Sequence, residues 1–378
     1  MQECPACPHR ELTREQSLAQ KESFVRAQLL NWEDRVAPIR SVPEGERWGY
    51  RDRAVLALEW YPERNRWKVG LRGRRSNPRN FREAPPVIAI PQCPVHSARI
   101  RALLETLPVE LPSAREIPFT HAVISGALLT LVVKARKSQI RPEVLAQLRE
   151  LPWQDMGLTG VMVDFHPSAG HRVLSSSGRE LIWGKDTAFA AGFTHGASAF
   201  LQLLPAMHAQ SISRAESHLC VPGVAGVLDF YCGIGVSLAR WSKLGFPSIG
   251  FELSGEAVKL ARLNAAAGGA ALEVLQGKCS ERLPQAERFM RDHSSKGRWA
   301  AYLNPPRQGL EPEVIEWLRC NAGVMSKLAI LSCSPATLAR DLRGLEAHFE
   351  ISLIEPYDFF PQALNVEVLV LLDSRSAV

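Results

Sequence analysis

The stretch VLDFYCGIGV, residues 227–236, decides the fold of this 378-residue chain. A small apolar run leads into Asp229, two glycines follow at Gly233 and Gly235, and an amphipathic stretch begins at Val236. This order predicts a strand, a tight turn and a helix. Such a unit opens the ligand crevice of a doubly wound α/β sheet, so we expect a Rossmann-like domain.

A second apolar run, SIGFE, ends in Glu252, and a helix is expected from Ala257 to Ala265. An acidic side chain at such a strand end can accept hydrogen bonds from ribose hydroxyls. The turn lacks the third glycine of a full dinucleotide fingerprint. Alone, it fits either an adenosine-cofactor site or a turn that only the fold requires.

The segment YLNPPRQG, residues 302–309, predicts a short strand that ends at Asn304. Proline cannot donate to a sheet ladder or continue a helix, so Pro305 and Pro306 predict a rigid loop. The loop follows the carboxyl end of a strand, where α/β enzymes place their chemistry.

The segment LSCSPATLARD, residues 331–341, predicts the end of a buried strand, then Cys333, then a helix. Ser334 is expected to cap this helix and Pro335 to occupy its first turn. A thiol at a helix N-terminus has a lowered pKa and more thiolate. The alternative is a buried structural cysteine.

Together with DFFPQALNVE, residues 358–367, these segments resemble the signature segments of the S-adenosylmethionine-dependent RNA uracil-5-methyltransferase family. Family members modify bacterial 23S rRNA and the T-loop of tRNA. The resemblance implies that Cys333 is the nucleophile and Glu367 the general base. Uracil C5 attacks a methyl sulfonium only after a thiolate has added to C6, and a carboxylate must then remove the C5 proton.

The resemblance also implies S-adenosylmethionine as cofactor. Gln202 in AFLQLLP matches the family glutamine that contacts the cofactor, and Asn304 is expected at the uracil edge. The expected pocket residues are Gln202, Asp229, Gly233, Gly235, Glu252 and Asn304. Departures from the family pattern, which indicate a divergent member, fall at Leu204, Lys278, Ser334 and Gln362.

Three cysteines in the first hundred residues predict a metal site. Cys4 and Cys7 form a C-x-x-C pair and Cys93 lies in QCPVHS, which is typical of zinc or iron–sulfur ligation. The resemblance implies a [4Fe-4S] cluster, although the first of the four family cysteines has no counterpart here. Three interpretations stay open: a cluster held by these cysteines and an outside ligand, a zinc site completed by His96, or a motif without metal.

The stretch from Arg47 to Arg82 holds ten arginines and one lysine against three acidic residues. Aromatic residues are interleaved with these cations: Trp48, Tyr50, Trp60, Tyr61, Trp67 and Phe81. Arginines neutralise phosphates and aromatic rings stack unpaired bases, so the stretch predicts a surface for single-stranded RNA. The alternative is a solvated face of a small β domain whose aromatic residues are core. Alternation in residues 54–61 and 66–73 predicts a β-hairpin.

We expect three regions: a metal-ligand tip and basic β region at 1–96, a central α/β RNA-binding region at 97–190, and the methyltransferase domain at 191–378. Residues 108–118, broken by prolines, are expected to be a linker. Strand LLTLVVKA, residues 128–135, and a helix from Pro142 to Glu150 are expected in the central region.

Composition supports a globular protein with 46% hydrophobic residues and a net charge of +6. Eight cysteines without a leader or a long apolar run indicate a cytoplasmic protein away from membranes, and we expect a monomer. The predicted function is formation of 5-methyluridine in 23S rRNA. The alternatives are uracil-5 methylation of tRNA, or a catalytically silent RNA-binding protein that retains the fold.

Overall fold

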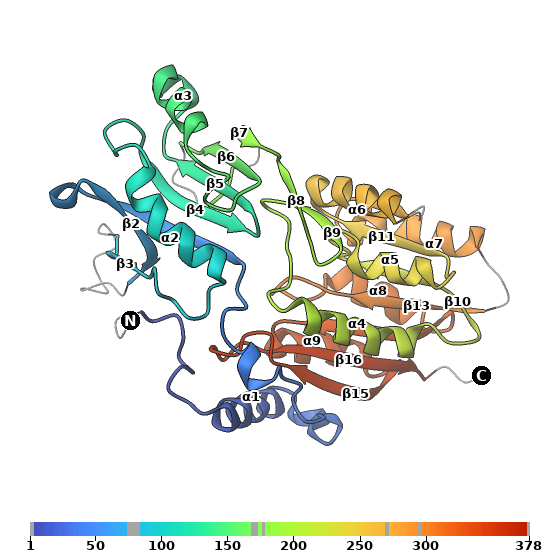
Figure 1. The fold of residues 1–378 in the computed structure, drawn as a ribbon. Helices are drawn as coiled ribbons and strands as arrows, with labels where there is room; N and C mark the ends of the chain where they lie inside the picture. The colour runs from blue at the N-terminus through green and yellow to red at the C-terminus, as the bar shows by residue number, and fades with distance from the viewer. Residues whose placement is uncertain are drawn as a thin grey trace. The chain divides into compact units, whose positions relative to one another are not determined.

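The computed structural model describes residues 4–73, 84–167, 173–175, 178–268, 272–293 and 297–375 (Figure 1). The chain forms two compact units. Unit 1 consists of Met1–Pro8 and Gly45–Ser198, and unit 2 consists of His9–Glu44 and Ala199–Val378. This division differs from the three expected regions, because the first two share one sheet and residues 9–44 join the catalytic unit.

Unit 2 is built on a seven-stranded sheet in the order β12-β11-β10-β13-β14-β16-β15. Its strands are β10 (Val224–Phe230), β11 (Ser248–Glu252), β12 (Glu273–Gln276), β13 (Arg298–Leu303), β14 (Met325–Ser332), β15 (Phe349–Tyr357) and β16 (Glu367–Ser374). The first five strands of this order are parallel, and β16 runs antiparallel to both β14 and β15. The order reverses between β10 and β13, which is where open α/β sheets bind their ligands.

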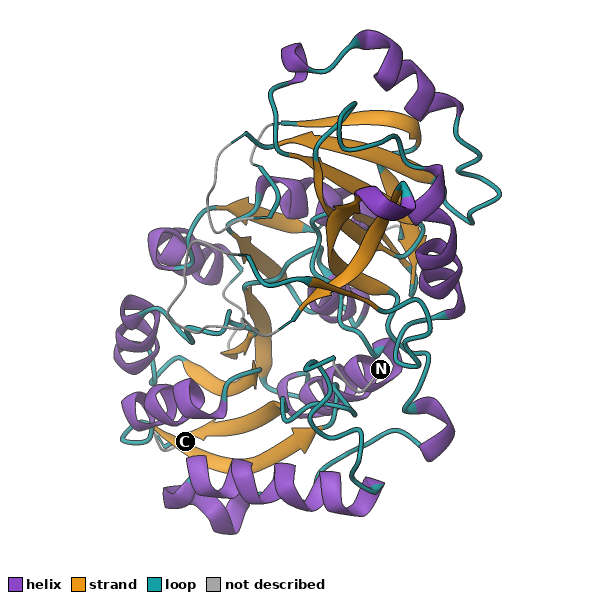
Figure 2. Ribbon diagram, turned by 90° about the vertical axis from the view of Figure 1, so that its left-hand side faces the viewer, coloured by secondary structure: helices purple, strands orange, loops and turns teal. Residues whose placement is uncertain are grey.

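Helices cover both faces of this sheet (Figure 2). They are α4 (Pro205–Leu219), α5 (Val236–Lys243), α6 (Gly255–Ala267), α7 (Leu283–Asp292), α8 (Pro312–Cys320) and α9 (Pro335–Leu345). Burial on both faces explains why β10, β13 and β14 are nearly continuous apolar runs. The expected doubly wound Rossmann-like methyltransferase fold is confirmed.

The N-terminal part of unit 2 contains α1 (Arg14–Gln28) and the 3₁₀ helix η1 (Leu30–Arg35). A capping box formed by Thr13 and Gln16 starts α1. The residues after η1 run beside β15, where Val36 bridges Ile354 and Arg40 bridges Tyr357. These N-terminal residues therefore cover the edge strand of the sheet.

Unit 1 holds a second seven-stranded sheet in the order β3-β2-β1-β4-β5-β6-β7. Its strands are β1 (Arg53–Tyr61), β2 (Arg66–Arg72), β3 (Val87–Ala89), β4 (Phe119–Ser125), β5 (Leu128–Val133), β6 (Gly160–Phe165) and β7 (Arg179–Gly184). Its helices are α2 (Ala98–Glu110) and α3 (Pro142–Glu150), and a hairpin of β8 (Thr187–Ala190) and β9 (Phe193–Gly196) follows. Apolar residues of β1, β4, β5 and β6 form one core with those of α2 and α3.

Local expectations in unit 1 are mostly confirmed. The hairpin of β1 and β2 forms, with Trp60 paired to Trp67, and α3 has the expected bounds. The linker expected from Pro108 is wrong at its start, because α2 continues through Pro108 to Glu110. Burial of Leu107 in the core outweighs the hydrogen bond that proline cannot donate in the last turn.

Within the described residues, no helix is long and apolar enough to cross a membrane.

Candidate active site

The signature segments of unit 2 meet at one edge of its sheet. Parallel β10, β13 and β14 present their carboxyl ends together, and the loops that follow them carry Gly233, Asn304 and Cys333. Glu252 ends β11 at the same edge. The fold thus gathers segments that lie up to a hundred residues apart.

The predicted nucleophile and the predicted base lie at the ends of two neighbouring strands. Ser332 of β14 pairs with Val368 of β16 in an antiparallel register. The pairing ends there: Cys333 directly follows Ser332, and Glu367, the first residue of β16, directly precedes Val368. The two side chains are close enough for the charge of Glu367 to raise the pKa of the Cys333 thiol. The structure therefore brings the two residues together.

Burial raises the pKa of the Cys333 thiol, and the nearby carboxylate of Glu367 raises it further. The positive charge of Arg307 opposes both effects. The expected lowering of this pKa by the helix N-terminus is therefore wrong for the site without RNA, because desolvation outweighs the dipole. Ser334 occupies the N-cap of α9 but makes no side-chain capping bond; its N–H instead donates to Ser332 Oγ at 3.3 Å.

Glu367 is only 2% exposed. Burial raises the pKa of its carboxyl to about 8, and the charge of Arg307 opposes this shift. Arg307 thus acts on both predicted catalytic groups, although no role was expected for it from sequence. Its place directly after the double proline was the available signal.

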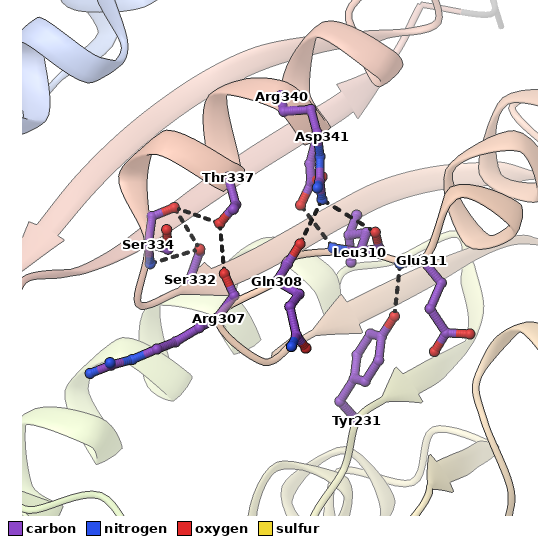
Figure 3. A network of polar contacts seen from close by, with 10 residues as sticks. All are labelled: Tyr231, Arg307, Gln308, Leu310, Glu311, Ser332, Ser334, Thr337, Arg340 and Asp341. Atoms are coloured by element: carbon purple, nitrogen blue, oxygen red, sulfur yellow. Dashed lines mark hydrogen bonds and ion pairs between the residues drawn. The ribbon is translucent and has the colours of Figure 1, made fainter. Parts of the chain in front are cut away.

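Helix α9 holds the loop that carries Arg307 (Figure 3). The Thr337 hydroxyl donates to the Arg307 carbonyl at 3.2 Å, and Arg340 Nη2 donates to the Gln308 carbonyl at 2.8 Å. The segments NPPRQG and SPATLARD therefore form one network, which fixes the guanidinium-bearing loop relative to the helix that follows the cysteine.

The same network requires a glycine at position 309. Asp341 Oδ2 accepts the Leu310 N–H at 2.9 Å, and Asp341 Oδ1 accepts from Arg340 Nη2 at 2.6 Å. Gly309 has a φ of 81° and passes so close that an added Cβ would lie 2.5 Å from Arg340 Nη2 and 2.5 Å from Asp341 Oδ2. A side chain at this position would push the loop away from α9.

The glycine turn and Glu252 are joined by hydrogen bonds at the carboxyl edge of the sheet. Glu252 Oε2 accepts the Gly233 N–H at 3.0 Å, and Oε1 accepts the Ser254 N–H at 2.7 Å. Gly233 has a φ of 56°, and a Cβ added there would meet nothing within 4 Å, so the backbone is open to close approach. A Cβ on Gly235 would lie 3.2 Å from Ala261 Cβ, so this glycine allows α6 to pack closely. These features fit an adenosine cofactor, because a carboxylate such as that of Glu252 accepts hydrogen bonds from ribose hydroxyls.

The other three residues predicted to contact the cofactor are Asp229, Asn304 and Gln202. Asp229 is fully buried, accepts from Trp241 Nε1 at 2.8 Å, and has a pKa raised to about 7 by burial. Asn304 follows β13, and its N–H donates to the Phe230 carbonyl at 3.3 Å, at the point where the strand order reverses. Gln202 is 9% exposed in the loop before α4. Cofactor contacts by these residues stay predictions.

Lys278, one of the departures from the family pattern, follows a residue that is hydrogen-bonded to Glu252. The Gly277 N–H donates to the Glu252 carbonyl at 3.0 Å, and Lys278 follows directly. Its side chain is 60% exposed, with Nζ 3.9 Å from Glu281 Oε1. A positively charged side chain therefore follows directly after this contact with Glu252.

The expected metal site is not assembled. The described part of the chain contains no group of three or more His, Cys, Asp or Glu side chains placed to hold a metal ion. Cys4 and Cys93 pack against the hydrophobic core of unit 1, and Cys7 is half-buried. His96 is 3% exposed, and burial followed by the charge of Arg51 lowers its pKa to about 4. Ligation of a [4Fe-4S] cluster or of zinc by these residues is therefore not shown in the described part of the chain.

The basic stretch of unit 1 is partly a core element. Trp67 is 3% exposed and packs edge-on against Trp60 with ring centroids 5.3 Å apart, as the alternative to an RNA surface requires. Lys68 Nζ lies 4.3 Å from the centroid of the Tyr61 ring. Several residues of the stretch lie outside the described part of the chain: Arg74, Arg75, Arg79, Phe81 and Arg82.

Comparison with known proteins shows which RNA methyltransferases the chain resembles. Residues 223–375 match the sequence model of the tRNA (Uracil-5-)-methyltransferase family. The chain is 25% identical over 379 residues to the 23S rRNA (uracil(1939)-C(5))-methyltransferase of Pseudomonas syringae pv. tomato, covering 98% of this chain and 78% of the relative. It is also 25% identical over 394 residues to an uncharacterized RNA methyltransferase of Thermosynechococcus vestitus, covering 98% and 82%.

The fold is shared with a solved structure. The crystal structure of Pyrococcus abyssi tRNA (uracil-54, C5)-methyltransferase in complex with S-adenosyl-L-homocysteine superimposes with a TM-score of 0.70. The superposition covers 97% of this chain and 86% of that chain, at 19% identity. The motifs of the chain, its fold and its relatives therefore all resemble those of the S-adenosylmethionine-dependent RNA uracil-5-methyltransferase family.

Proposed function

We propose that this protein forms 5-methyluridine in 23S rRNA, with Cys333 as the nucleophile and Glu367 as the general base. The observation that carries the proposal is that Cys333 and Glu367 are the neighbours, along the chain, of the paired residues Ser332 and Val368 at the ends of adjacent strands. The relative of Pseudomonas syringae, which matches nearly the whole chain, is named for a 23S rRNA uridine. This supports rRNA over tRNA as the substrate.

The glycine turn and Glu252 are proposed to bind S-adenosylmethionine. Gly233 leaves its backbone open, the Glu252 carboxylate is held ready for ribose hydroxyls, and Leu253, 63% exposed, offers an apolar surface for the adenine ring. Gln202 is proposed to contact the same ligand. When bound, S-adenosylmethionine supplies an electrophilic methyl group.

The first covalent step belongs to Cys333. Its thiol loses a proton to water, and the positive charge of Arg307 favours the thiolate against burial and against the neighbouring carboxylate. The sulfur then bonds to uracil C6, and the electron pair of the C5=C6 bond moves to the O4 side as an enolate. This makes C5 a nucleophile.

The last step belongs to Glu367. Once C5 carries the methyl group, the Glu367 carboxylate takes the remaining C5 proton. The released electron pair forms the C5=C6 bond again, the C6–S bond breaks, and Cys333 leaves as a thiolate. Only ionised Glu367 can do this, and its pKa of about 8 means that this form grows as the pH rises through that value.

The target uridine must leave its stack to reach Cys333, which costs a few kcal/mol that flanking contacts must offset. The arginines between Arg47 and Arg82 are proposed to supply phosphate contacts for this purpose, so that RNA binding weakens with rising salt.

The test of the proposal compares two cysteines. An unmethylated 23S rRNA transcript that contains 5-fluorouridine should trap wild-type protein as a denaturant-resistant complex in the presence of S-adenosylmethionine. The base cannot remove fluorine from C5 as it removes the C5 proton, so the adduct cannot resolve. Cys333→Ala should give no complex and no methylation, whereas Cys320→Ala, which removes an exposed cysteine of the same unit, should behave as wild type.

A second arm identifies the RNA. Nucleoside analysis with and without the gene should show loss of 5-methyluridine from 23S rRNA alone. Loss from tRNA would move the substrate to tRNA. No loss from either RNA, together with no trapped complex, would favour the silent RNA-binding protein.

A further inference from the structure

The loop that leads into Glu367 is held by a residue from the far end of the sequence. Lys21 of α1 is fully buried, and its Nζ lies 2.5 Å from Asp358 Oδ1 and 3.0 Å from the Phe360 carbonyl oxygen. Asp358 is 1% exposed. One ammonium group thus binds both the side chain that begins this loop and the backbone two residues later.

The same N-terminal segment holds the loop at a further point. The His9 N–H donates to the Gln362 carbonyl at 3.2 Å, and His9 Nδ1 lies 2.9 Å from Ser17 Oγ on α1. The Asp358 N–H donates to the Arg40 carbonyl at 2.8 Å. Positions 358, 360 and 362 are therefore all bound by residues 9–40.

The strand that pairs with the base is tied down in the same way. Tyr357 is the register partner of Glu367 and donates its hydroxyl to Glu355 Oε2 at 2.6 Å. Arg40 Nε donates to Glu355 Oε1 at 2.9 Å. The base is therefore bordered, on the loop side and on the β15 side, by contacts that begin in the N-terminal segment.

A buried ion pair adds little net free energy of unfolding, because desolvation of both charges offsets their attraction. Its benefit is a fixed geometry. From this placement we propose that Lys21 is a positioning residue for Glu367, which holds the loop 358–366 so that the carboxylate meets the C5 proton. The inference rests on the proposed roles of Cys333 and Glu367.

The two halves of the reaction should respond differently to loss of this contact. Cys333 follows β14, and the loop that carries Arg307 is held by Thr337 and Arg340 of α9. Formation of the adduct should therefore survive. Proton removal by Glu367 should slow, since displacement of a catalytic group by about 1 Å can cost roughly a hundredfold in rate.

The experiment uses the full-length chain with two variants. Lys21→Met removes the ammonium but leaves Asp358 buried and unpaired, which can unfold the protein. The double variant Lys21→Met/Asp358→Leu replaces the pair by apolar side chains of similar size, a change that proteins often tolerate, but it still lacks the donor to the Phe360 carbonyl. Thermal unfolding and S-adenosylmethionine binding verify that each variant is folded.

The matched control is Lys327→Met. Lys327 and Asp373 form an ion pair of 2.6 Å between β14 and β16, at the opposite end of these strands from Glu367. Each protein is mixed with an unmodified 23S rRNA transcript, and methyl transfer in a single turnover, multiple turnover and denaturant-resistant adduct are measured.

The double variant is expected to transfer methyl in a single turnover within about threefold of wild type, to lose at least about tenfold in multiple turnover, and to accumulate adduct on unfluorinated RNA. Wild-type turnover in the folded double variant would overturn the positioning role and leave the pair as packing alone. Equal losses in single and multiple turnover would overturn it too. Absence of adduct in a parallel Glu367→Gln reaction would instead overturn the proposed function, and this inference with it.

Discussion

At the scale of the residue, the site keeps a carboxyl group where it ionises with difficulty. Glu367 is buried and its pKa is raised to about 8, although the positive charge of Arg307 opposes the shift. A base with this pKa matches a proton transfer near neutral pH. The same burial destabilises the folded protein whenever the group is ionised.

This cost should be measurable through Glu367→Gln. The carboxyl ionises near pH 4.5 in an unfolded chain and near pH 8 in the folded one, so between these values the folded state binds more protons and the free energy of unfolding falls as pH rises. The amide variant should therefore match wild type near pH 5 and exceed it by roughly 2–5 kcal/mol near pH 9. Urea unfolding at both pH values measures the difference.

The control is Glu350→Gln, which changes an exposed carboxyl on β15. It should show no such dependence. A Glu367→Gln difference that stays constant with pH would contradict the raised pKa.

At the scale of the element, α9 and the loop 304–311 act as one body. Local sequence signals predicted these elements well, because the apolar runs and the double proline each act over a few residues. They misjudged what depends on surroundings: the pKa of Cys333, which burial decides, and the cap at Ser334, whose N–H bonds to Ser332 instead. Arg307 could be seen in the sequence, but the sequence did not indicate that its charge acts on both Cys333 and Glu367.

The coupling of loop and helix predicts a specific effect of Gly309→Ala. An alanine at position 309 would have to adopt a φ of 81°, and its Cβ would collide with Arg340 and with buried Asp341. We expect a loss of about 1–3 kcal/mol in the free energy of unfolding and a fall of at least about tenfold in methylation. Thermal unfolding and methyl incorporation into 23S rRNA transcript are the measurements.

Gly323→Ala is the matched control for this substitution, because a Cβ at Gly323 meets nothing within 4 Å. It should change stability by less than about 0.5 kcal/mol. Equal effects of the two substitutions would argue against a fixed loop.

At the scale of the whole molecule, the two compact units do not follow the order of the chain. Unit 2 takes residues from both ends, and the pair Lys21–Asp358 spans 337 residues. No local pattern signals such a pair, which is why the expected regions missed the N-terminal contribution to the catalytic unit. The family motifs, in contrast, each lie within a few residues of Cys333 or Glu367, so the sequence alone could propose these two as the centre of the site.

The cysteines of unit 1 give a prediction for the whole protein. Because Cys4 and Cys93 pack against the hydrophobic core of unit 1, we expect anaerobically purified protein to be colourless, with iron and zinc each below about 0.1 atom per chain. A chelator should leave its thermal unfolding unchanged. About four irons per chain with a brown colour, or one zinc, would contradict this.

The long span between Lys21 and Asp358 also sets an order in time. A ribosome that adds roughly 5–20 residues per second needs about 20 to 70 seconds to pass from one to the other, a separation of 337 residues. Residues 45–198, which belong to unit 1, are completed within this interval, and the strands of unit 2 against which α1 packs are made after them. The proposed base, Glu367, is made after Asp358. The proposed active centre is therefore completed only after residue 367 has emerged, and a chain interrupted before that residue lacks the base.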